Sequence, residues 1–361
     1  MSIAELSGAT AVEPTSEKET AAILRSANET GQAVIPTGGG TKLDWGNPPR
    51  RADVLLSMRR QNRVIEHAWA DLTVTVEAGC TVAELQRTLA EHGQRLAIDP
   101  LWPERATIGG ILSTNDSGSL RLGYGSLRDL IIGITLVLAD GTIAKSGGKV
   151  VKNVAGYDLP KLATGAMGTL GVITRAVFRL HPLPLNSRTL TIPTADAAEA
   201  QRVVLAILSA QLAPAAVQVR NGNVDILLEG TLDGIAAQES VIKTFGTVQE
   251  GSSTVWNARE ELWGSGTVVK FTTLPTRIAT ASGSFLRFVI QATGVGYAQF
   301  EGDLAALRAA MERDGGSLVI LGKTGLDAWG SPGDALPLMR AVKAQFDPKG
   351  TLNPGRFVGG I

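Results

Sequence analysis

The sequence predicts a fold of the α+β class, divided into more than one domain. With 361 residues the chain exceeds what one ordinary hydrophobic core holds, so we expect two domains or one domain with a cap. Segments with the alternating pattern of strands and segments with the pattern of helices follow one another along the whole chain. Closely spaced prolines at 181–185 favour extended chain, and the character of the sequence changes after them.

The first half is expected to contain short strands and helices in alternation. Residues 17–30 are rich in alanine and carry Ile23 and Leu24 on one side, which predicts a helix. Thr81 and Glu84 form a capping box that begins a second helix. The expected strands of this half are 34–35, 53–56, 73–77, 131–139, 142–144 and 171–180. Asp140-Gly141 is the turn signal between 131–139 and 142–144.

The second half also mixes both kinds of element. The predicted strands are 189–193, 215–220, 224–229, 267–274 and 317–321. Helical patterns at 196–212, 232–245 and 301–313 alternate with them. This order fits an α+β and an α/β arrangement, and the segment contains few polar motifs. The tail, 346–357, returns to closely spaced prolines and glycines.

Composition excludes several classes of function. Lysine plus arginine and aspartate plus glutamate both number 34, so no basic excess indicates nucleic acid or an anionic membrane surface. The single cysteine, Cys80, rules out a disulfide framework and a cysteine-based metal cluster. Residues 1–5 lack a signal-peptide pattern, and the most apolar stretch, 130–139, is too short to span a bilayer. We expect a soluble cytoplasmic protein, with attachment to the inner membrane through a partner left open.

A strand that runs into three successive glycines is the first candidate binding site. It comprises Thr37, Gly38, Gly39, Gly40 and Thr41. Glycine permits positive φ and close approach of a ligand, and consecutive N–H groups form a concave anion site that suits a diphosphate. A plain surface turn explains the glycines equally well. The spacing matches neither G-x-G-x-x-G nor G-x-x-x-x-G-K-[ST], so a Rossmann-type NAD site is not supported.

Three further clusters of small and polar residues follow the glycine loop. The first joins Pro100 with 106–110 and 115–118, where helix–strand packing is the alternative explanation and is favoured by spacing alone. The second covers 124–129. The third extends from Lys152 to Ile173 and carries a dense polar set, for which a buried network that fixes the fold is the alternative.

Taken in order, the four clusters resemble flavoproteins of the vanillyl-alcohol-oxidase type, whose FAD-binding domain is like that of p-cresol methylhydroxylase (PCMH). The resemblance covers residues from about 17 to 185, and the tail with Asp347-Pro348 and Asn353-Pro354-Gly355-Arg356 fits it. Each motif alone is weak evidence for this family, whereas all four in the order found in the family are strong evidence. Within this family, residues 148–159 (GKVVKNVAGYDL) look most like the FAD-binding subunits of bacterial glycolate oxidases. The short cap and the ending with Trp329-Gly330 look similar too.

The resemblance implies a domain order and a cofactor. We expect a PCMH-type FAD-binding domain of two α/β subdomains over 1–185 and an α+β cap domain over 186–333. A C-terminal segment, 334–361, is expected to pack back on the FAD-binding domain. Positions that match cofactor-binding positions of the family are Thr37, Gly38, Gly39, Gly40 and Thr41 for the diphosphate, then Pro100, Ala106, Thr107, Gly109, Gly110, Thr114, Asp116, Ser117, Val172 and Ile173. Gly39→Val is expected to lose flavin while the fold largely persists.

The attachment of FAD is expected to be non-covalent. Some members of the family bind the flavin through a histidine or cysteine at its ring. None of His67, His92 and His181 lies in the glycine loop. Cys80 follows Gly79 at the end of a predicted strand, where burial makes a thiol unreactive.

The sequence departs from catalytic members of the family in two places. Those members carry a histidine-rich motif in the cap that holds a divalent metal, whereas this chain has no histidine after His181. They also commonly have arginine and threonine where Val151 and Val154 stand. The remaining candidates for acid–base or carboxylate-binding roles are Lys152, Tyr157 and Lys161, for which an internal network is at least as good an explanation. No metal site is expected.

The resemblance therefore implies an FAD-binding subunit of a glycolate oxidase complex. Its expected partners are a catalytic flavin subunit, an iron–sulfur subunit and a small 2-hydroxy acid substrate. Two alternatives are an independent FAD-dependent oxidoreductase of another alcohol or 2-hydroxy acid, and a non-catalytic structural subunit without cofactor.

Overall fold

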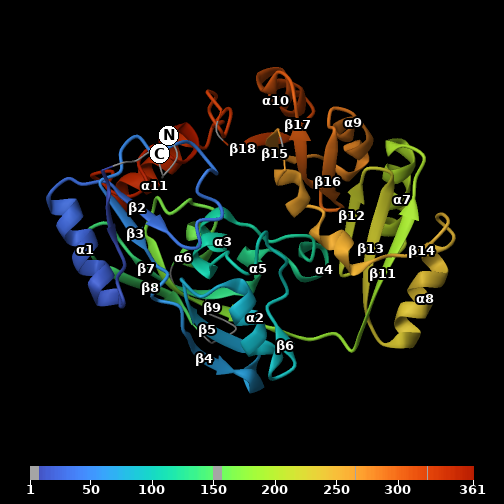
Figure 1. Ribbon diagram of the computed structural model, residues 1–361, viewed down its shortest axis with the longest axis horizontal. Helices are drawn as coiled ribbons and strands as arrows, with labels where there is room; N and C mark the ends of the chain where they lie inside the picture. The colour runs from blue at the N-terminus through green and yellow to red at the C-terminus, as the bar shows by residue number, and fades with distance from the viewer. Residues whose placement is uncertain (1–7, 149–156, 265, 323) are drawn as a thin grey trace. The chain divides into compact units, whose positions relative to one another are not determined.

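The computed structural model describes residues 8–148, 157–264, 266–322 and 324–361, which form two compact units (Figure 1). The first unit comprises residues up to Ser117, then Ser126–Leu183 and Asp327–Ile361. The second comprises Gly118–Gly125 and Pro184–Leu326. The chain thus leaves the first unit twice, and the sequence analysis did not anticipate that residues 118–125 belong to the second.

The first unit contains three sheets and mostly short helices. Its strands are β1 (Thr10–Val12), β2 (Val34–Thr37), β3 (Val54–Ser57), β4 (Val64–Ala68), β5 (Thr73–Glu77), β6 (Gln94–Arg95), β7 (Ile131–Val137), β8 (Ile143–Gly147), β9 (Val172–Arg179) and β10 (His181–Pro182). Its helices are α1 (Glu17–Glu29), α2 (Val82–Ala90), α3 (Ile108–Thr114), α5 (Leu127–Leu130), α6 (Leu159–Ala163) and α11 (Leu336–Phe346), with 3-10 turns at Trp69–Asp71 and Val358–Gly360.

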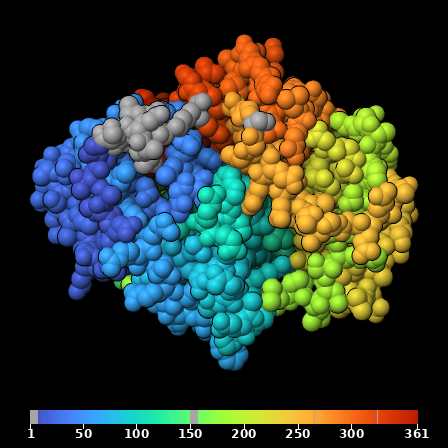
Figure 2. Space-filling model, in the orientation of Figure 1, coloured from blue at the N-terminus to red at the C-terminus, as the bar shows by residue number. Residues whose placement is uncertain are grey.

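A parallel three-stranded sheet, in the order β1-β3-β2, holds the strand that leads into the glycine loop. Helix α1 begins at Ser16, whose side chain accepts a hydrogen bond from the N–H of Glu19. Leu24 of α1 is buried with Val34 and Leu56 of the sheet because one face of the helix is apolar. The polar face of α1 forms part of the surface of this unit (blue in Figure 2).

A five-stranded antiparallel sheet, in the order β4-β5-β9-β7-β8, forms the larger part of the first unit. Its central strands are largely buried, and their apolar side chains pack with α2, α3 and α5 in one core. The predicted hairpin is present: the N–H of Gly141 donates to the carbonyl of Leu138, and Gly141 has φ +84°. Phe178 of β9 and Leu85 of α2 are among the fully buried side chains.

The second unit is one antiparallel sheet with helices on it. Its strands are β11 (Asn186–Pro193), β12 (Ala216–Arg220), β13 (Asn223–Gly230), β14 (Gln249–Glu250), β15 (Thr267–Thr272), β16 (Arg287–Gln291), β17 (Val295–Phe300) and β18 (Ser317–Leu321), in the sheet order β14-β11-β13-β12-β16-β17-β15-β18. Its helices are α4 (Arg121–Tyr124), α7 (Ala197–Ser209), α8 (Leu232–Ile242), α9 (Ile278–Ser282) and α10 (Leu304–Arg313), with 3-10 turns at Ser253–Asn257, Glu260–Trp263 and Pro275–Arg277.

The two faces of this eight-stranded sheet differ in character. Alternate residues such as Val217 and Ile226 pack with α7, α8, α9 and α10 in an apolar core. The residues between them, such as Gln218 and Asp225, are buried on the opposite face and hydrogen-bonded there. The antiparallel sheet settles the choice that the strand and helix order left open, because every strand pair in the second unit is antiparallel.

The C-terminal segment lies against β2 of the parallel three-stranded sheet. The N–H of Val34 donates to the carbonyl of Thr351 at 2.7 Å, and the N–H of Asn353 donates to the carbonyl of Val34 at 3.0 Å. The Asp347 carboxylate accepts from the N–H groups of Thr351 and Leu352 and fixes the turn that follows α11. No helix in the described part of the chain has the length and hydrophobicity that a bilayer crossing requires.

Candidate functional site

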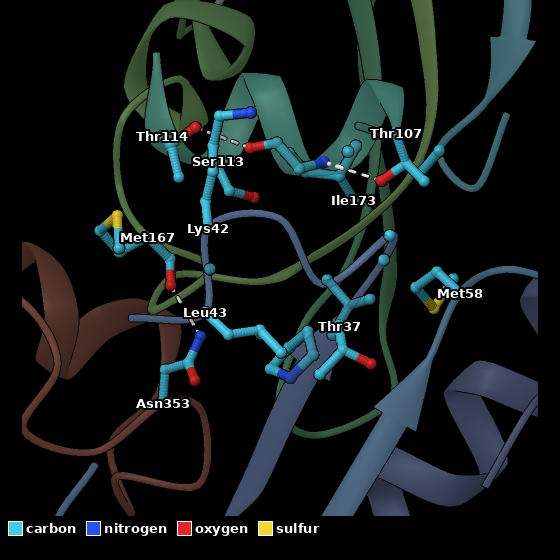
Figure 3. A pocket seen from close by; sticks show the side chains of 18 of the residues that line it. Thr37, Lys42, Leu43, Met58, Thr107, Ser113, Thr114, Met167, Ile173 and Asn353 are labelled. Atoms are coloured by element: carbon cyan, nitrogen blue, oxygen red, sulfur yellow. Dashed lines mark hydrogen bonds between the residues drawn. The ribbon is translucent and has the colours of Figure 1, made fainter. Parts of the chain in front are cut away.

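A cavity that opens to solvent lies within the first unit. It is lined by the loop after β2, by α3, by the segment that leads into β9 and by the C-terminal segment. Figure 3 shows Met167 and Asn353 together on one side of this cavity, Met58 on the other, and α3 between Thr107 and Thr114. Residues far apart in the sequence therefore meet in one site.

The glycine loop is close to the segment before α3, and side chains would prevent this. A Cβ at Gly38 would lie 2.1 Å from Thr107 Oγ1, and a Cβ at Gly39 would lie 1.7 Å from the carbonyl oxygen of Arg105. Gly40 has φ +76°, which favours glycine. Within the described chain, the N–H groups of Gly38, Gly39, Gly40 and Thr41 have no protein acceptor. They are available as donors to an anion at the cavity.

Helix α3 forms the opposite wall. Thr107 caps the helix, because its Oγ1 accepts a hydrogen bond from the N–H of Gly110 at 3.3 Å. Thr114 Oγ1 donates to the carbonyl of Gly110 at 2.9 Å. A Cβ at Gly109 would lie 3.0 Å from the side chain of Ala78, so the glycine lets the helix approach the end of β5. This wall presents small residues and hydroxyl groups to the cavity.

Two cations, Lys42 and Arg356, line the cavity in the described part of the chain, and no carboxylate lines it there. Lys42 Nζ lies 3.3 Å from Asp116 Oδ2, and both side chains are buried. Arg356 Nη2 donates to the carbonyls of Leu43 and Trp45 at 2.8 and 2.7 Å. Burial lowers the pKa of Arg356 to about 10, against the opposing effect of Asp44. The charge balance at this cavity favours an anionic ligand.

Most of the residues expected to hold the cofactor lie at this cavity. The lining contains Thr37, Gly38, Gly39, Gly40, Thr41, Thr107, Gly109, Gly110, Thr114, Val172 and Ile173. Pro100, Ala106, Asp116 and Ser117 are buried and do not line it. Asp116 accepts from the N–H of Leu101 and pairs with Lys42, and Ser117 Oγ accepts from the N–H of Leu127. Asp116 and Ser117 therefore support the wall from behind.

The cavity also contains residues that the sequence analysis did not select. They are Pro36, Lys42, Leu43, Met58, Ala78, Ser113, Met167, Gly168, Gly171, Asn353 and Arg356. Gly168 and Gly171 stand in a cluster that the sequence does indicate. Met58 and Ala78 carry no local signal, because only the fold brings them to the cavity.

The candidates for acid–base roles do not line the cavity. Lys152 lies outside the described residues, as do Val151 and Val154. Tyr157 is 91% exposed. Lys161 pairs with Asp158 at 3.0 Å, and both side chains are more than half exposed. For Tyr157 and Lys161, the structure therefore shows neither a place at the cavity nor the buried network offered as the alternative.

No histidine or cysteine lines the cavity in the described part of the chain. His92 stacks on Trp69 with ring centroids 5.5 Å apart and meets His67 edge-on at 5.2 Å. His181 lies in β10. Burial raises the pKa of the Cys80 thiol to about 11, so this cysteine is a poor nucleophile. These positions agree with non-covalent attachment of a ligand.

Two family matches cover most of the segments that build this cavity, but not residues 167–173. Residues 9–147 match the family described as FAD binding domain, and residues 331–357 match the family described as FAD linked oxidases, C-terminal domain. The first match contains the glycine loop and α3, and the second contains Asn353 and Arg356. The cofactor expected from the sequence is confirmed: it is FAD. The donor loop, the two cations and the small-residue wall fit a dinucleotide with a diphosphate.

The chain is also similar to several curated proteins. It is 34% identical to the glycolate oxidase subunit GlcD of Bacillus subtilis over 207 residues, which is 57% of this chain and 44% of that protein. It is 29% identical to the D-lactate dehydrogenase of Archaeoglobus fulgidus over 409 residues, covering 96% of this chain and 90% of that protein. The chain thus spans less than half of the first relative and most of the second.

Solved structures of alkyldihydroxyacetonephosphate synthase share the fold. One matches 96% of this chain and 77% of its own chain, with a TM-score of 0.74 and 20% sequence identity. The α+β fold with a PCMH-type domain, expected from the sequence, is confirmed by this similarity.

Proposed function

We propose a function from one premise: this chain carries the FAD-binding domain and the C-terminal domain of the FAD-linked oxidases. The protein is proposed to be the FAD-binding subunit of a glycolate oxidase complex, which oxidises glycolate to glyoxylate. A catalytic flavin subunit and an iron–sulfur subunit are its proposed partners, and the second of these receives the electrons. When bound, FAD supplies the acceptor for the two electrons of the CH–OH oxidation.

The cavity of the first unit is the proposed FAD site. The loop from Thr37 to Thr41 holds the diphosphate, because the N–H groups of Gly38 to Thr41 are adjacent, uncommitted and flanked by cations. Thr107, Gly109, Gly110 and Thr114 of α3 form the wall against which the nucleotide lies. Val172 and Ile173 contribute at the start of β9. Pro100, Ala106, Asp116 and Ser117 keep a supporting role. The second unit is proposed as the cap.

The position of the histidines is the observation that carries the accessory role. Oxidation of a 2-hydroxy acid needs a base near the hydroxyl group, and histidine is the commonest such base. His67, His92 and His181 are all in the first unit, and the described cavity lining contains none of them. Among the described residues there is also no group of three or more His, Cys, Asp or Glu placed to hold a metal. A chain that holds FAD without such a base suits a subunit that works beside a catalytic partner.

Two further observations support a multi-subunit assembly. The relative from Bacillus subtilis is itself named as a subunit of glycolate oxidase. One cysteine is too few to ligate an iron–sulfur cluster, so a cluster that receives the electrons requires another chain.

Anaerobic reduction of the bound flavin tests this proposal. The chain purified alone with FAD should keep its oxidised flavin spectrum when glycolate is added. The chain co-purified with a catalytic flavin subunit and an iron–sulfur subunit should lose that spectrum under the same conditions. Stoichiometric flavin reduction by glycolate in the chain alone would show that it needs no catalytic partner.

The main alternative is an independent FAD-dependent dehydrogenase of another 2-hydroxy acid. The similarity to a D-lactate dehydrogenase over 96% of this chain favours it. A panel of 2-hydroxy acids, including D-lactate, tested on the isolated chain distinguishes the two. Reduction by one member of the panel supports the dehydrogenase. A purified protein that does not take up FAD at all supports the non-catalytic structural subunit.

A further inference from the structure

Two buried polar side-chain atoms of the cavity residues have no hydrogen-bond partner in the described part of the chain. Asn353 is 3% exposed; its Nδ2 donates to the carbonyl of Met167 at 2.7 Å, while its Oδ1 has no donor in the described chain. Arg356 is also 3% exposed, and its Nε has no acceptor there. A buried polar atom without a partner costs free energy, and native proteins keep few of them. Both residues line the cavity, so a ligand there can complete their hydrogen bonds.

The charge of Arg356 is compensated only in part, because Asp44 acts on it electrostatically from beyond ion-pair distance. No carboxylate lies within ion-pair distance of its guanidinium among the described residues, and its two hydrogen bonds reach neutral carbonyls. Lys42, the other cation at the cavity, differs because Asp116 lies against it. An isolated buried cation is unfavourable unless an anion joins it. The diphosphate of FAD is such an anion.

The backbone at the contact between Asn353 and Met167 is left-handed on both sides. Asn353 has φ +44°, and Met167, whose carbonyl it contacts, has φ +54°. Asparagine adopts this region readily, whereas methionine rarely does, and unusual backbone conformations persist at ligand clamps where other contacts hold them. The left-handed Met167, fixed by the side chain of Asn353, therefore agrees with a ligand clamp at this end of the cavity. Figure 3 shows this contact as the dashed line between Asn353 and Met167.

The remainder of the C-terminal segment has its partners within the protein. Lys343 Nζ donates to Asp347 Oδ2 and to the carbonyls of Thr169 and Leu352. Residues 351–353 pair with β2, the strand that leads into the glycine loop. The unpartnered atoms thus fall only where this segment reaches the cavity.

We propose that residues 351–356 form a latch that FAD closes, with Asn353 Oδ1 accepting a hydrogen bond from the cofactor and Arg356 facing its negative charge. The inference rests on the proposed FAD site. It extends the site to the end of the chain, and FAD is expected to stabilise that segment further. In the absence of FAD the latch keeps its contacts with β2 but bears the unpaired groups.

Arg356→Gln is the first test, with Arg340→Gln as its matched control. Arg340 is an exposed arginine of the same C-terminal segment, and its Nη2 also donates to a carbonyl, that of Gly359. FAD affinity is measured by quenching of flavin fluorescence on titration into apoprotein. Arg356→Gln should raise the Kd for FAD about ten- to a hundred-fold, the range for loss of a hydrogen bond or contact with a charged group. Arg340→Gln should leave it within about two-fold.

Asn353→Gly is the second variant, because glycine accepts the left-handed backbone at this position. It should raise the Kd for FAD about three- to ten-fold, as expected for one neutral hydrogen bond. Unchanged affinity in both Arg356→Gln and Asn353→Gly, each folded by circular dichroism, overturns the latch.

Amide hydrogen exchange of the wild-type chain gives a readout that needs no variant. Addition of FAD should slow exchange at Asn353 and Arg356, whose N–H groups donate to the carbonyls of Val34 and Asn353. Exchange in α10, which lies in the second unit, serves as the internal reference. FAD that binds and protects the glycine loop but leaves residues 351–356 unchanged refutes the latch and leaves the proposed site intact. Wild-type protein that binds no FAD refutes the site itself.

Discussion

Each unit of this chain buries a charged group, and the protein treats the two in opposite ways. In the second unit, Asp225 is fully buried and accepts hydrogen bonds from Thr191, Gln218 and Arg220. In the first unit, Arg356 is buried with an unpaired Nε and without a carboxylate partner in the described chain. The first arrangement is complete as it stands, whereas the second is completed by a ligand.

The comparison separates residues that build the fold from residues that build the site. Buried polarity alone does not identify a site, because the polar face of the eight-stranded sheet is buried and satisfied. What distinguishes the cavity is the coincidence of uncommitted N–H donors, a buried cation without an ion-pair partner in the described chain, and the left-handed backbone of Met167. We therefore expect substitutions in the two places to differ in kind: the first should change stability, and the second should change cofactor affinity.

Asp225→Ala should have the largest effect on stability. It leaves Arg220 and Gln218 without their shared acceptor on a buried face, and breaking a buried pair in this way costs about 3 kcal/mol or more. Urea unfolding followed by circular dichroism measures the change. Asp233→Ala, at an exposed position in the first turn of α8, is the control and should change stability by no more than about 0.5 kcal/mol. FAD affinity at a temperature where Asp225→Ala is folded should stay at the wild-type value. A large loss of FAD affinity in Asp225→Ala would contradict the expectation that substitutions in the second unit change stability and not cofactor binding.

Gly39→Ala should have the next largest effect, and it should act on both stability and cofactor binding. The new Cβ would lie 1.7 Å from the carbonyl oxygen of Arg105, so the loop and the segment before α3 must separate. The loss of flavin expected for Gly39→Val stays a prediction, to which this contact adds a cost in stability. The FAD Kd should rise at least about ten-fold, and the melting temperature should fall.

Gly40→Ala is the matched control in the same loop. Its Cβ has room, since the nearest atom is Leu43 Cδ1 at 3.6 Å, and the cost is the left-handed backbone at φ +76°. That cost is about 1 kcal/mol, so the FAD Kd should rise no more than about ten-fold. Equal losses in Gly39→Ala and Gly40→Ala would show that loop conformation, rather than packing against Arg105, determines binding.

The fold could be predicted where the local pattern was strong. The strand at 73–77 and the hairpin at Asp140-Gly141 are present as expected, because alternation and turn residues define them locally. The strand β1 was missed, since three residues that pair in parallel with β3 carry no pattern of their own. Helix α11 was also missed, because the expectation for the tail rested on the prolines and glycines that follow it.

The site was predictable only in part, for a related reason. Successive glycines indicate a close approach of backbone from the sequence alone, so Gly38 and Gly39 could be selected. Gly109 and Gly110 were selected only through the family resemblance. Arg356 could not be selected as a cavity residue, because it reaches Leu43 across 313 positions of sequence. Its position depends on the pairing of residues 351–353 with β2, and no local sequence pattern predicts this pairing.

Glu77→Gln should have the smallest effect, and it tests whether a satisfied charge next to the cavity behaves like those of the second unit. Glu77 is 3% exposed and precedes the cavity residue Ala78. Burial raises the pKa of its carboxyl group, but hydrogen bonds from the side chain and N–H of Arg63 outweigh burial and hold the pKa below its usual 4.5. Because folding lowers this pKa, the stabilisation is present above about pH 4.5 and is lost as the pH falls through the folded-state value.

Glutamine cannot ionise, so the Glu77→Gln variant should lose less stability than the wild type when the pH is lowered from about 7 to about 3.5. Urea unfolding of both proteins at the two pH values measures the difference. At neutral pH the variant should be slightly less stable than the wild type and should bind FAD with the same Kd. Its partner Arg63 lies outside the cavity lining, so the pair has no group left for a ligand to complete. A clear rise in Kd would mean that charged groups with complete hydrogen bonds next to the cavity also affect FAD affinity. Missing hydrogen-bond partners would then not explain why Arg356 affects cofactor binding and Asp225 does not.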